Sequence, residues 1–380
     1  MKKAVCFLLM LCLLAGLVPA AASSSAALDA IPRTFEGEDP EQLVEEYSWD
    51  ELVERIIDHC RAEPNSFALG YCNTVTGEEH YYDGDRPMNG ASLYKTPLNM
   101  LYAEKVSRGE ITLDEEYNGQ TLRELQAASL IYSSNSAANL LMERCGGWVT
   151  YRRDIAGYLG RTEEEITEEY LGRKSLFTAR ELTVCMDLLA REPERFPDML
   201  ECLLEATPGL FLEYADVPYE IAQKFGYWDR DGALQINACG IVYTEEPIVL
   251  TVLTSGMSSS GVLMRDYTEL CCVWAEYQHR LHVEEEARIA SEKAAEEARL
   301  AEEACIASEK AAEEARLAEE ARIASEKAAE EARLAEEARL AAEARAAALR
   351  RTLLLCAAGA GTAVFAVCVL RSKKRKKGGR

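Results

Sequence analysis

The sequence contains little histidine and shows no metal-ligand spacing. Only four histidines occur in 380 residues, and they are scattered along the chain (His59, His80, His279 and His282). The cysteines do not have the spacing of a zinc site either. Because a zinc site needs three or four closely grouped ligands, a metal-dependent hydrolase is not expected. The sequence predicts neither a metal nor another cofactor.

An excess of basic residues is also lacking. The 42 Lys and Arg residues are outnumbered by 65 Asp and Glu residues, and the formal net charge is -23. Proteins that bind nucleic acid present a basic surface to the phosphates. The acidic charge therefore argues against nucleic acid as a partner.

Cysteine, in contrast, is not scarce. Eight of the 13 cysteines fall within the expected globular part of the chain. Outside the cell, an even number of cysteines permits disulfides, but the spacing does not define the pairs.

Two apolar runs lie near the two ends of the chain. Lys2 and Lys3 precede the first run, and small residues follow it; this pattern is typical of a cleaved secretory signal, here residues 1–22. A retained membrane anchor is the alternative. The second run is followed by a basic tail, residues 371–380. It predicts a transmembrane helix over residues 352–370, with the N-terminal domain extracellular and the C-terminus cytoplasmic, as for a single-pass protein of the cell membrane.

The segment 283–351 contains a repeat with a period of 17 residues and has no Gly or Pro. The stretch Ala-Arg-Ile-Ala-Ser-Glu-Lys from Ala287 recurs almost unchanged from Ala304 and Ala321. Its composition of strong helix formers predicts a helical stalk. The Ile and Leu residues do not form one stripe, whereas the alanines recur at close to the spacing of a left-handed coiled coil. Two alternatives follow, a lone charged helix and a coiled coil through which the chain self-associates.

The remaining pattern predicts an α+β domain over residues 48–282, preceded by a linker over residues 23–47. Strands are expected near both ends of this domain, over 66–73, 79–82, 221–228, 234–243 and 248–255. Helices are expected over 49–61 and 262–282 and through most of 91–204. We therefore expect one antiparallel sheet built from both chain ends, with a helical subdomain inserted between them.

The first motif with catalytic potential is Ser92-Leu-Tyr-Lys95, at the expected start of a helix. Residues three apart lie on the same helix face, so the hydroxyl and the amine can meet. A serine hydroxyl needs a neighbouring base to act as a nucleophile, and burial can lower the pKa of a lysine until it serves as that base. A single Ser-x-x-Lys is common by chance, so this motif alone predicts little.

Two further motifs follow in order. Ser133-Ser134-Asn135 stands between helical stretches, where polar residues commonly cap a helix or line a loop. Lys224-Phe225-Gly226 lies on an expected strand, where the lysine is either an edge charge or a site residue. In a site, the glycine would let a substrate backbone approach the strand.

Together, the three motifs resemble the S-x-x-K, S-D-N and K-T-G set of class A β-lactamases and penicillin-binding proteins. The text after the second motif, Ser136-Ala-Ala-Asn-Leu-Leu, and the run Pro247-Ile-Val-Leu-Thr-Val are similar to that family as well. The resemblance covers about residues 48–282 and implies the β-lactamase/transpeptidase-like fold.

The resemblance also implies a role for each motif residue. Ser92 would form an acyl-enzyme, Lys95 would take its proton, and Ser133 would pass that proton to the leaving nitrogen. The expected substrate-binding groups, besides the oxyanion-hole N–H groups of Ser92 and Tyr227, are Asn135, Lys224 and Gly226.

The sequence departs from the family pattern in three places. Ser134 replaces an aspartate, and Phe225 replaces the Thr or Ser that binds a substrate carboxylate. Glu168 stands near the position of the family's deacylating glutamate, but Gly172 replaces the asparagine that accompanies it. We therefore expect Glu168 to be a surface acid, with a deacylation base as the alternative.

Three functions are compatible with this pattern. The first is a D-Ala-D-Ala carboxypeptidase-like serine hydrolase that acts on a peptidoglycan peptide or is acylated by a β-lactam-type small molecule. The second is a β-lactamase. The third is an impaired pseudoenzyme that binds a cell-wall ligand, which Phe225 favours and the intact Ser92 and Lys95 disfavour.

Overall fold

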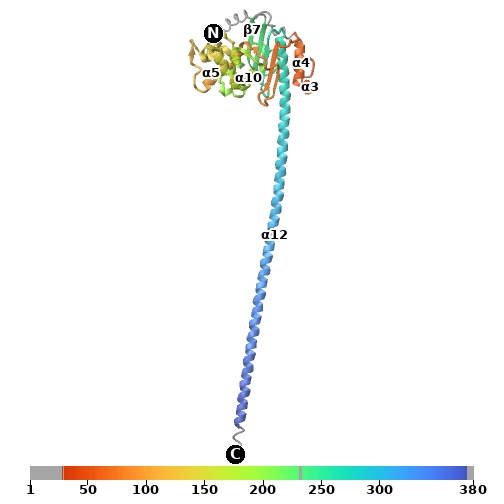
Figure 1. The fold of residues 1–380 in the computed structure, drawn as a ribbon. Coiled ribbons are helices and arrows are strands. Elements are labelled where there is room, and N and C mark those ends of the chain that lie inside the picture. The colour runs from red at the N-terminus through yellow and green to blue at the C-terminus, as the bar shows by residue number, and fades with distance from the viewer. Residues whose placement is uncertain (1–27, 29, 231–232, 375–380) are drawn as a thin grey trace, which may run out of the picture. The chain divides into compact units, whose positions relative to one another are not determined.

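The computed structural model describes the backbone of residues 28, 30–230 and 233–374, with side chains up to Cys356 (Figure 1). It forms two units, Met1–Glu286 and Ala287–Arg380. The expected signal peptide over residues 1–22 and the tail residues 375–380 lie outside the described part, so secretion and an extracellular location stay predictions. The described cysteines, from Cys60 to Cys356, are free thiols.

The first unit is built on a five-stranded sheet with the order β2-β1-β9-β8-β7, in which all neighbours pair antiparallel. The strands come from both ends of the domain: β1 (Phe67–Asn73), β2 (Glu79–Tyr82), β7 (Ile221–Arg230), β8 (Ala233–Val242) and β9 (Ile248–Thr254). Every residue of β1 and β9 is buried, as expected for central strands covered on both faces. The predicted α+β architecture is therefore confirmed.

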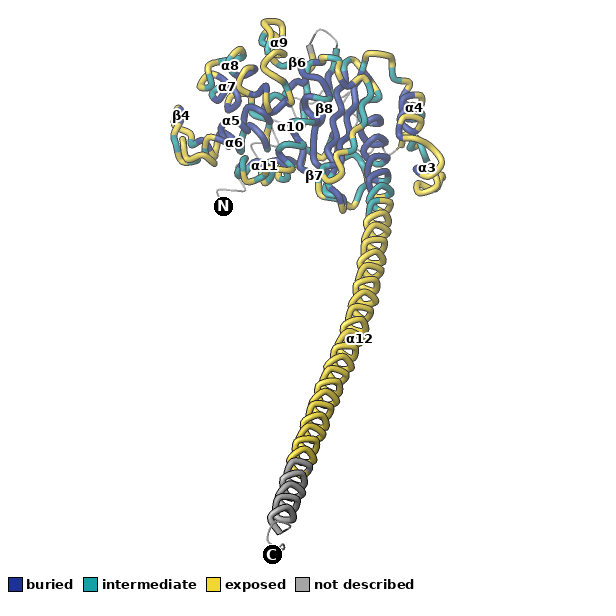
Figure 2. The backbone as a smooth tube through the Cα atoms, turned by 60° about the horizontal axis from the view of Figure 1, so that its bottom comes forward, coloured by how far each residue is buried: buried dark blue, intermediate teal, exposed yellow. Residues whose placement is uncertain are grey.

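Helices cover both faces of this sheet. On one face, α4 (Trp49–Cys60) and the start of α12 (Ser260–Lys374) share a hydrophobic core with the sheet. On the other face, α10 (Ala179–Arg191) packs against β1, β8 and β9. The other helices of the inserted subdomain are α5 (Lys95–Ser107), α6 (Leu122–Leu130), α7 (Asn135–Arg144), α8 (Gly147–Asp154), α9 (Glu168–Gly172) and α11 (Met199–Leu204). Figure 2 shows the buried backbone concentrated in the sheet and in the helices next to it.

Local sequence sets where several of these helices begin. Three of them start at capping boxes, in which a Ser or Thr caps the helix and a Glu three residues later bonds back to the cap. The pairs are Ser48–Glu51 before α4, Thr121–Glu124 before α6 and Thr178–Glu181 before α10.

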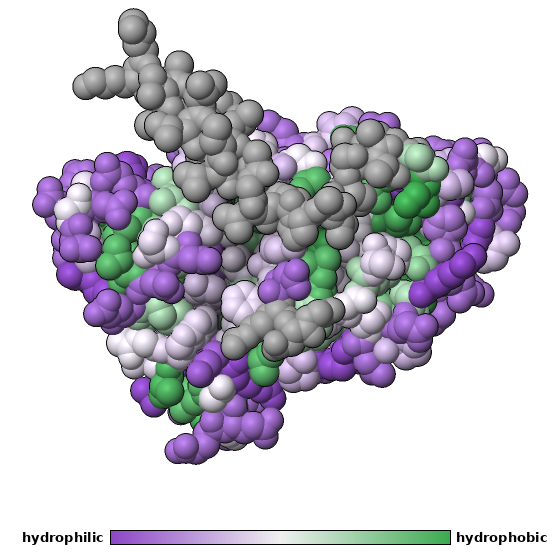
Figure 3. All heavy atoms as spheres, turned by 90° about the horizontal axis from the view of Figure 1, so that it is seen from above, coloured by the Kyte–Doolittle hydropathy of each residue, from purple (hydrophilic) through white to green (hydrophobic). Residues whose placement is uncertain are grey.

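The face of the molecule shown in Figure 3 is mostly hydrophilic, and its hydrophobic side chains gather in small separate patches.

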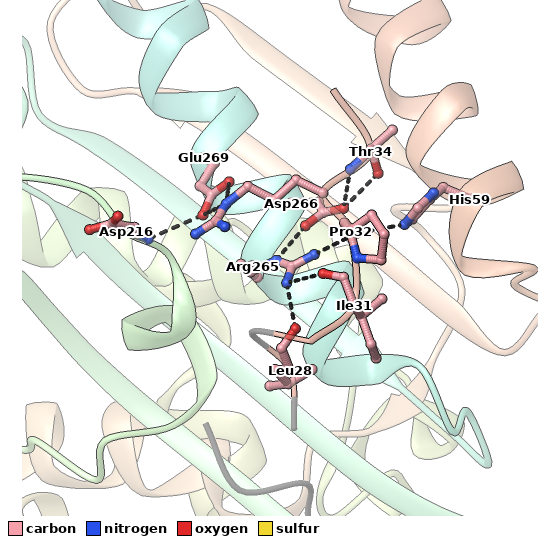
Figure 4. Close-up of polar contacts among 10 residues, drawn as sticks. Leu28, Ile31, Pro32, Thr34, His59, Asp216, Arg265, Asp266 and Glu269 are labelled. Atoms are coloured by element: carbon pink, nitrogen blue, oxygen red, sulfur yellow. Dashed lines mark hydrogen bonds and ion pairs between the residues drawn. The ribbon is translucent and has the colours of Figure 1, made fainter. Parts of the chain in front are cut away.

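The segment expected as a linker, residues 23–47, includes ordered structure that belongs to the domain. Helix α3 (Pro40–Glu46) buries Leu43 and Val44 in the core beside α4 and α12. Ahead of it, Arg265 of α12 binds the chain at three backbone carbonyls, with distances of 2.9 Å to Leu28, 3.0 Å to Ile31 and 3.1 Å to Pro32 (Figure 4).

Two acidic residues of α12 complete this attachment. Asp266 lies 2.7 Å from Arg265 and accepts hydrogen bonds from the backbone and the hydroxyl of Thr34. Glu269 pairs with Arg33 at 2.9 Å. Polar contacts with side chains more than 200 positions later in the sequence thus hold this segment, together with the burial of Leu28 in the core.

Replacing Arg265 with leucine is expected to lower the free energy of unfolding by about 3–5 kcal/mol, because it leaves Asp266 and the three carbonyls short of a buried partner. Arg265 is only 1% exposed. The midpoint of urea unfolding measures the loss. The matched control is Arg280→Leu, also on α12, which breaks the exposed ion pair between Arg280 and Glu41 of α3. This variant should lower the free energy of unfolding by about 1 kcal/mol or less. Equal losses for the two variants would contradict a structural role for the buried guanidinium.

The second unit is the continuation of α12. All its described side chains, from Ala287 to Cys356, are exposed. Its charges form ion pairs within the helix at i, i+3 and i, i+4, such as Glu296–Arg299 at 2.6 Å and Arg299–Glu303 at 3.0 Å. Each such pair adds only a few tenths of a kcal/mol (~0.2–0.5) to helix stability.

The prediction of a separate transmembrane helix over residues 352–370 is wrong. Residues 352–370 continue α12 without a break. Among the residues that the structure describes, no helix is long and apolar enough to cross a bilayer. The uncharged run is the end of this long helix, in which Glu and Arg recur at short intervals over residues 284–351, and each of those charges would be costly to bury in hydrocarbon.

Candidate active site

Ser92 lies where the chain turns from a short strand into a helix. It belongs to the 3-10 turn η1 (Ala91–Tyr94), which leads directly into α5. The preceding Ala91 has a φ of +50°, a left-handed conformation that is uncommon for a residue with a side chain. Ser92 is partly exposed, so its hydroxyl can be reached from solvent.

Lys95 is the centre of a hydrogen-bonded cluster below that hydroxyl. Its Nζ lies 3.1 Å from Ser92 Oγ, 3.2 Å from Ser133 Oγ and 2.6 Å from the carbonyl oxygen of Ser133. A fourth contact, at 2.8 Å, is with Asn135 Oδ1. The side chain is fully buried, and this burial lowers the pKa of Lys95 to about 8. A fraction of the amine is therefore neutral near pH 7.

Ser133 reaches the cluster from the connection between α6 and α7, and Asn135 from the first position of α7. Ser133 has a φ of +53°, and in this conformation both its carbonyl oxygen and its hydroxyl lie near Lys95. Ser134 caps α7 by accepting a hydrogen bond from the backbone N–H of Ala137. The middle residue of the motif thus has a structural contact, while the residues on either side contact the lysine.

Lys224 approaches the same hydroxyl from β7. Its Nζ lies 3.0 Å from Ser133 Oγ and 2.9 Å from the carbonyl oxygen of Phe225. The side chain is fully buried, and burial, followed by the charge of Lys95, lowers the pKa of Lys224 well below its usual value. Because two nitrogen atoms can donate to Ser133 Oγ, the hydroxyl's own hydrogen is left to donate elsewhere.

Gly226 brings the edge strand β7 against the turn that carries Ser92. A Cβ at this position would lie 2.7 Å from the carbonyl oxygen of Gly90 and 3.1 Å from the backbone nitrogen of Ser92. The sequence interpretation was that this glycine admits a substrate backbone. In the structure the missing Cβ leaves room for the backbone of η1, which places the neighbouring residue Tyr227 beside the segment of Ser92; contact of Gly226 with a substrate stays a prediction.

Glu168 is not brought into this cluster. It is the first residue of α9 and is exposed. Among the described contacts, none joins Glu168 to Ser92, Lys95 or Ser133. Gly172 ends the same short helix.

Sequence reasoning missed Asn89, which holds the turn before Ser92. Its Oδ1 accepts hydrogen bonds from the backbone N–H of Ala91 at 3.0 Å and from the hydroxyl of Ser175 at 3.2 Å. Its backbone and amide also bond to Asn237 and Gln235 of β8. The dipeptide Asn-Gly, a common turn signal, could have drawn attention to this position.

The cluster's chemistry comes from hydroxyl, amide and amine groups. Within the described part of the chain, no group of three or more His, Cys, Asp or Glu side chains is arranged to hold a metal ion.

Comparison with known proteins shows the family of this chain. A family model described as the beta-lactamase enzyme family matches residues 51–269, more than half of the chain. A β-lactamase of Bacillus licheniformis is 31% identical over 169 residues, which are 40% of this chain and 53% of that protein. The chain thus spans about half the length of this relative.

Two solved structures share the fold. A β-lactamase from Chitinophaga pinensis has a TM-score of 0.51 at 18% identity, over 60% of this chain and 98% of the other. The extended-spectrum β-lactamase TLA-3 has a TM-score of 0.51 at 16% identity, over 60% of this chain and 99% of the other. At such identities the likeness shows the fold alone.

Proposed function

This chain belongs to the beta-lactamase enzyme family of serine hydrolases, and from that premise we propose that Ser92 is the nucleophile of an acyl-transfer reaction on an amide or ester. The observation that carries the proposal is the position of Lys95. A fully buried amine lies 3.1 Å from a partly exposed serine hydroxyl. A general base requires such direct contact with the nucleophile's hydroxyl.

The first step is attack of Ser92 Oγ on the substrate carbonyl. Neutral Lys95 accepts the hydroxyl proton as the new C–O bond forms, and the carbonyl oxygen becomes an oxyanion. The backbone N–H groups of Ser92 and Tyr227 are the proposed donors to that oxyanion, since Gly226 keeps their two segments together. One such donor is worth about 10²–10³ in rate in other enzymes.

The second step breaks the bond to the leaving group. Ser133 donates its hydroxyl proton to the leaving nitrogen or oxygen and recovers a proton from Lys95, whose Nζ is 3.2 Å away. Lys224 keeps Ser133 Oγ in place from the opposite side. Asn135 is the proposed contact for the acyl part of the substrate, and the products of the step are the acyl-enzyme and the released amine or alcohol.

Deacylation by water lacks an evident base. Glu168 is exposed on α9 and outside the Lys95 cluster, so the acyl-enzyme is proposed to persist. Slow release favours a penicillin-binding type of protein over a rapid β-lactamase. The similarity to a named β-lactamase keeps β-lactam hydrolysis as the second candidate.

An alkyl fluorophosphonate tests the proposed nucleophile, because it reacts with activated serines and carries no carboxylate. Intact mass is expected to show one phosphonate adduct on the full wild-type chain and none on Ser92→Ala. Ser107→Ala, which removes an exposed hydroxyl at the end of α5, is the matched control and should be labelled at the wild-type rate. Labelling of Ser92→Ala, or no labelling of the wild type, would reject the proposal and favour a non-catalytic binding protein.

A further inference from the structure

The two buried amines at the site have no N–H group left for an additional anion. Lys224 Nζ already lies 3.0 Å from Ser133 Oγ, 2.9 Å from the carbonyl oxygen of Phe225 and 4.0 Å from the centroid of the Phe225 ring. Lys95 has four oxygen neighbours within 3.2 Å for at most three hydrogens. Each amine is therefore saturated by the protein itself.

The side chain of Phe225, on the strand beside Ser92, offers no hydrogen-bond donor. Its ring is partly buried and stacks on Phe211, with centroids 5.1 Å apart and an interplanar angle of 28°. Phe211 is 5% exposed and has a φ of +70°, which a bulky residue adopts only where its surroundings hold it. The buried Phe211 thus holds the ring of Phe225 in place, and Phe225 is the apolar group next to Lys224.

A carboxylate that leaves water needs hydrogen-bond donors in exchange, and its burial is costly without them. Beside Lys224 the aromatic pair offers none, whereas an uncharged ester or alkyl group would meet a compatible apolar surface. Resting on the proposed function, we propose that this site takes acyl substrates with no carboxylate next to the scissile bond, and that Phe225 is the residue that determines this specificity. The substrate class is a neutral ester or amide, and Phe225 acts through contact with the leaving part.

Benzylpenicillin and its methyl ester form a matched pair of probes, because they share the reactive amide and differ only in the carboxylate. The rate constant for acylation of the full chain is measured for each by intact mass, with Ser92→Ala as the blank. The wild type is expected to react about tenfold or more faster with the methyl ester, in line with the usual worth of a hydrogen bond to a charged group.

Two variants of nearly equal shape separate a missing donor from missing space. Phe225→Thr adds a hydroxyl, and Phe225→Val provides the same volume without it. Phe225→Thr is expected to shift the ratio of the two rate constants toward the carboxylate form by about tenfold to a hundredfold, while Phe225→Val keeps the wild-type preference. Urea unfolding of both variants shows whether they are folded to the same extent.

Each outcome has a distinct meaning. Faster reaction of the wild type with the carboxylate form, or equal ratios for the Thr and Val variants, would overturn the inference and leave Ser92 as the nucleophile. Absence of a Ser92 adduct with both penicillins and with the fluorophosphonate would reject the proposed function itself, and the inference with it.

Discussion

Replacing Lys95 with alanine is expected to slow the labelling of Ser92 by about 10²–10⁴-fold, the usual contribution of a general base. The loss follows from the contact between Lys95 Nζ and Ser92 Oγ, which gives the serine its only nearby proton acceptor among the described side chains. The rate constant for reaction with the fluorophosphonate measures the effect. Because Lys95 also holds Ser133 and Asn135, urea unfolding is measured alongside.

The pH dependence of the wild type tests the same assignment without a mutation. The amine must be neutral to accept a proton, and its pKa is lowered by burial to about 8. The neutral fraction, and with it the labelling rate, should therefore rise about tenfold for each pH unit below that value and level off above it. The expected difference between pH 6 and the plateau is about a hundredfold.

Lys105→Ala provides the control, because Lys105 is an exposed lysine on the same helix α5. It should leave both the labelling rate and the pH profile unchanged. A flat profile between pH 6 and 9, or a Lys95→Ala variant that reacts at nearly the wild-type rate, would remove Lys95 from the role of base.

One contact of the site could be predicted from short-range geometry, and the others from the resemblance of the three motifs to a known set. The i, i+3 spacing of Ser92 and Lys95 brings the two groups together at the start of any helix. Short apolar runs bounded by turn residues predict the strands of the sheet, and the resemblance to the three-motif set of class A β-lactamases predicts that Ser133 and Lys224 lie near Ser92. These residues do meet in the structure.

Other features depend on contacts that no local pattern contains. Residues 28–34 were expected to be part of a linker, and the contacts that hold them come from distant residues of α12, among them Arg265 and Asp266. The sequence does not distinguish Asn89 by its contacts, because its backbone partner Asn237 lies on the distant strand β8. The sequence interpretation treated the uncharged residues 352–370 as a separate helix, because it considered their hydropathy apart from the charged helix that precedes them. In the structure both belong to α12.

Replacing Gly226 with alanine is expected to slow the labelling of Ser92 by about 10²–10³-fold, the cost of losing one oxyanion donor. The added methyl group would lie 2.7 Å from the carbonyl oxygen of Gly90 and 3.2 Å from the Cβ of Ala91. Since the first of these contacts is with backbone, β7 and η1 must move apart. The movement separates the N–H groups of Ser92 and Tyr227, while β7 keeps its pairing with β8.

The matched control is Gly157→Ala, because a Cβ at Gly157 meets no atom within 4 Å. It should react with the fluorophosphonate at the wild-type rate. Its free energy of unfolding in urea should equal that of the wild type to within ~0.5 kcal/mol. Gly226→Ala should remain folded, with its loss confined to reactivity. If Gly226→Ala is labelled as fast as Gly157→Ala, close contact between β7 and the serine turn is not needed for the reaction. The oxyanion would then have to be stabilised by groups other than the paired N–H donors of Ser92 and Tyr227.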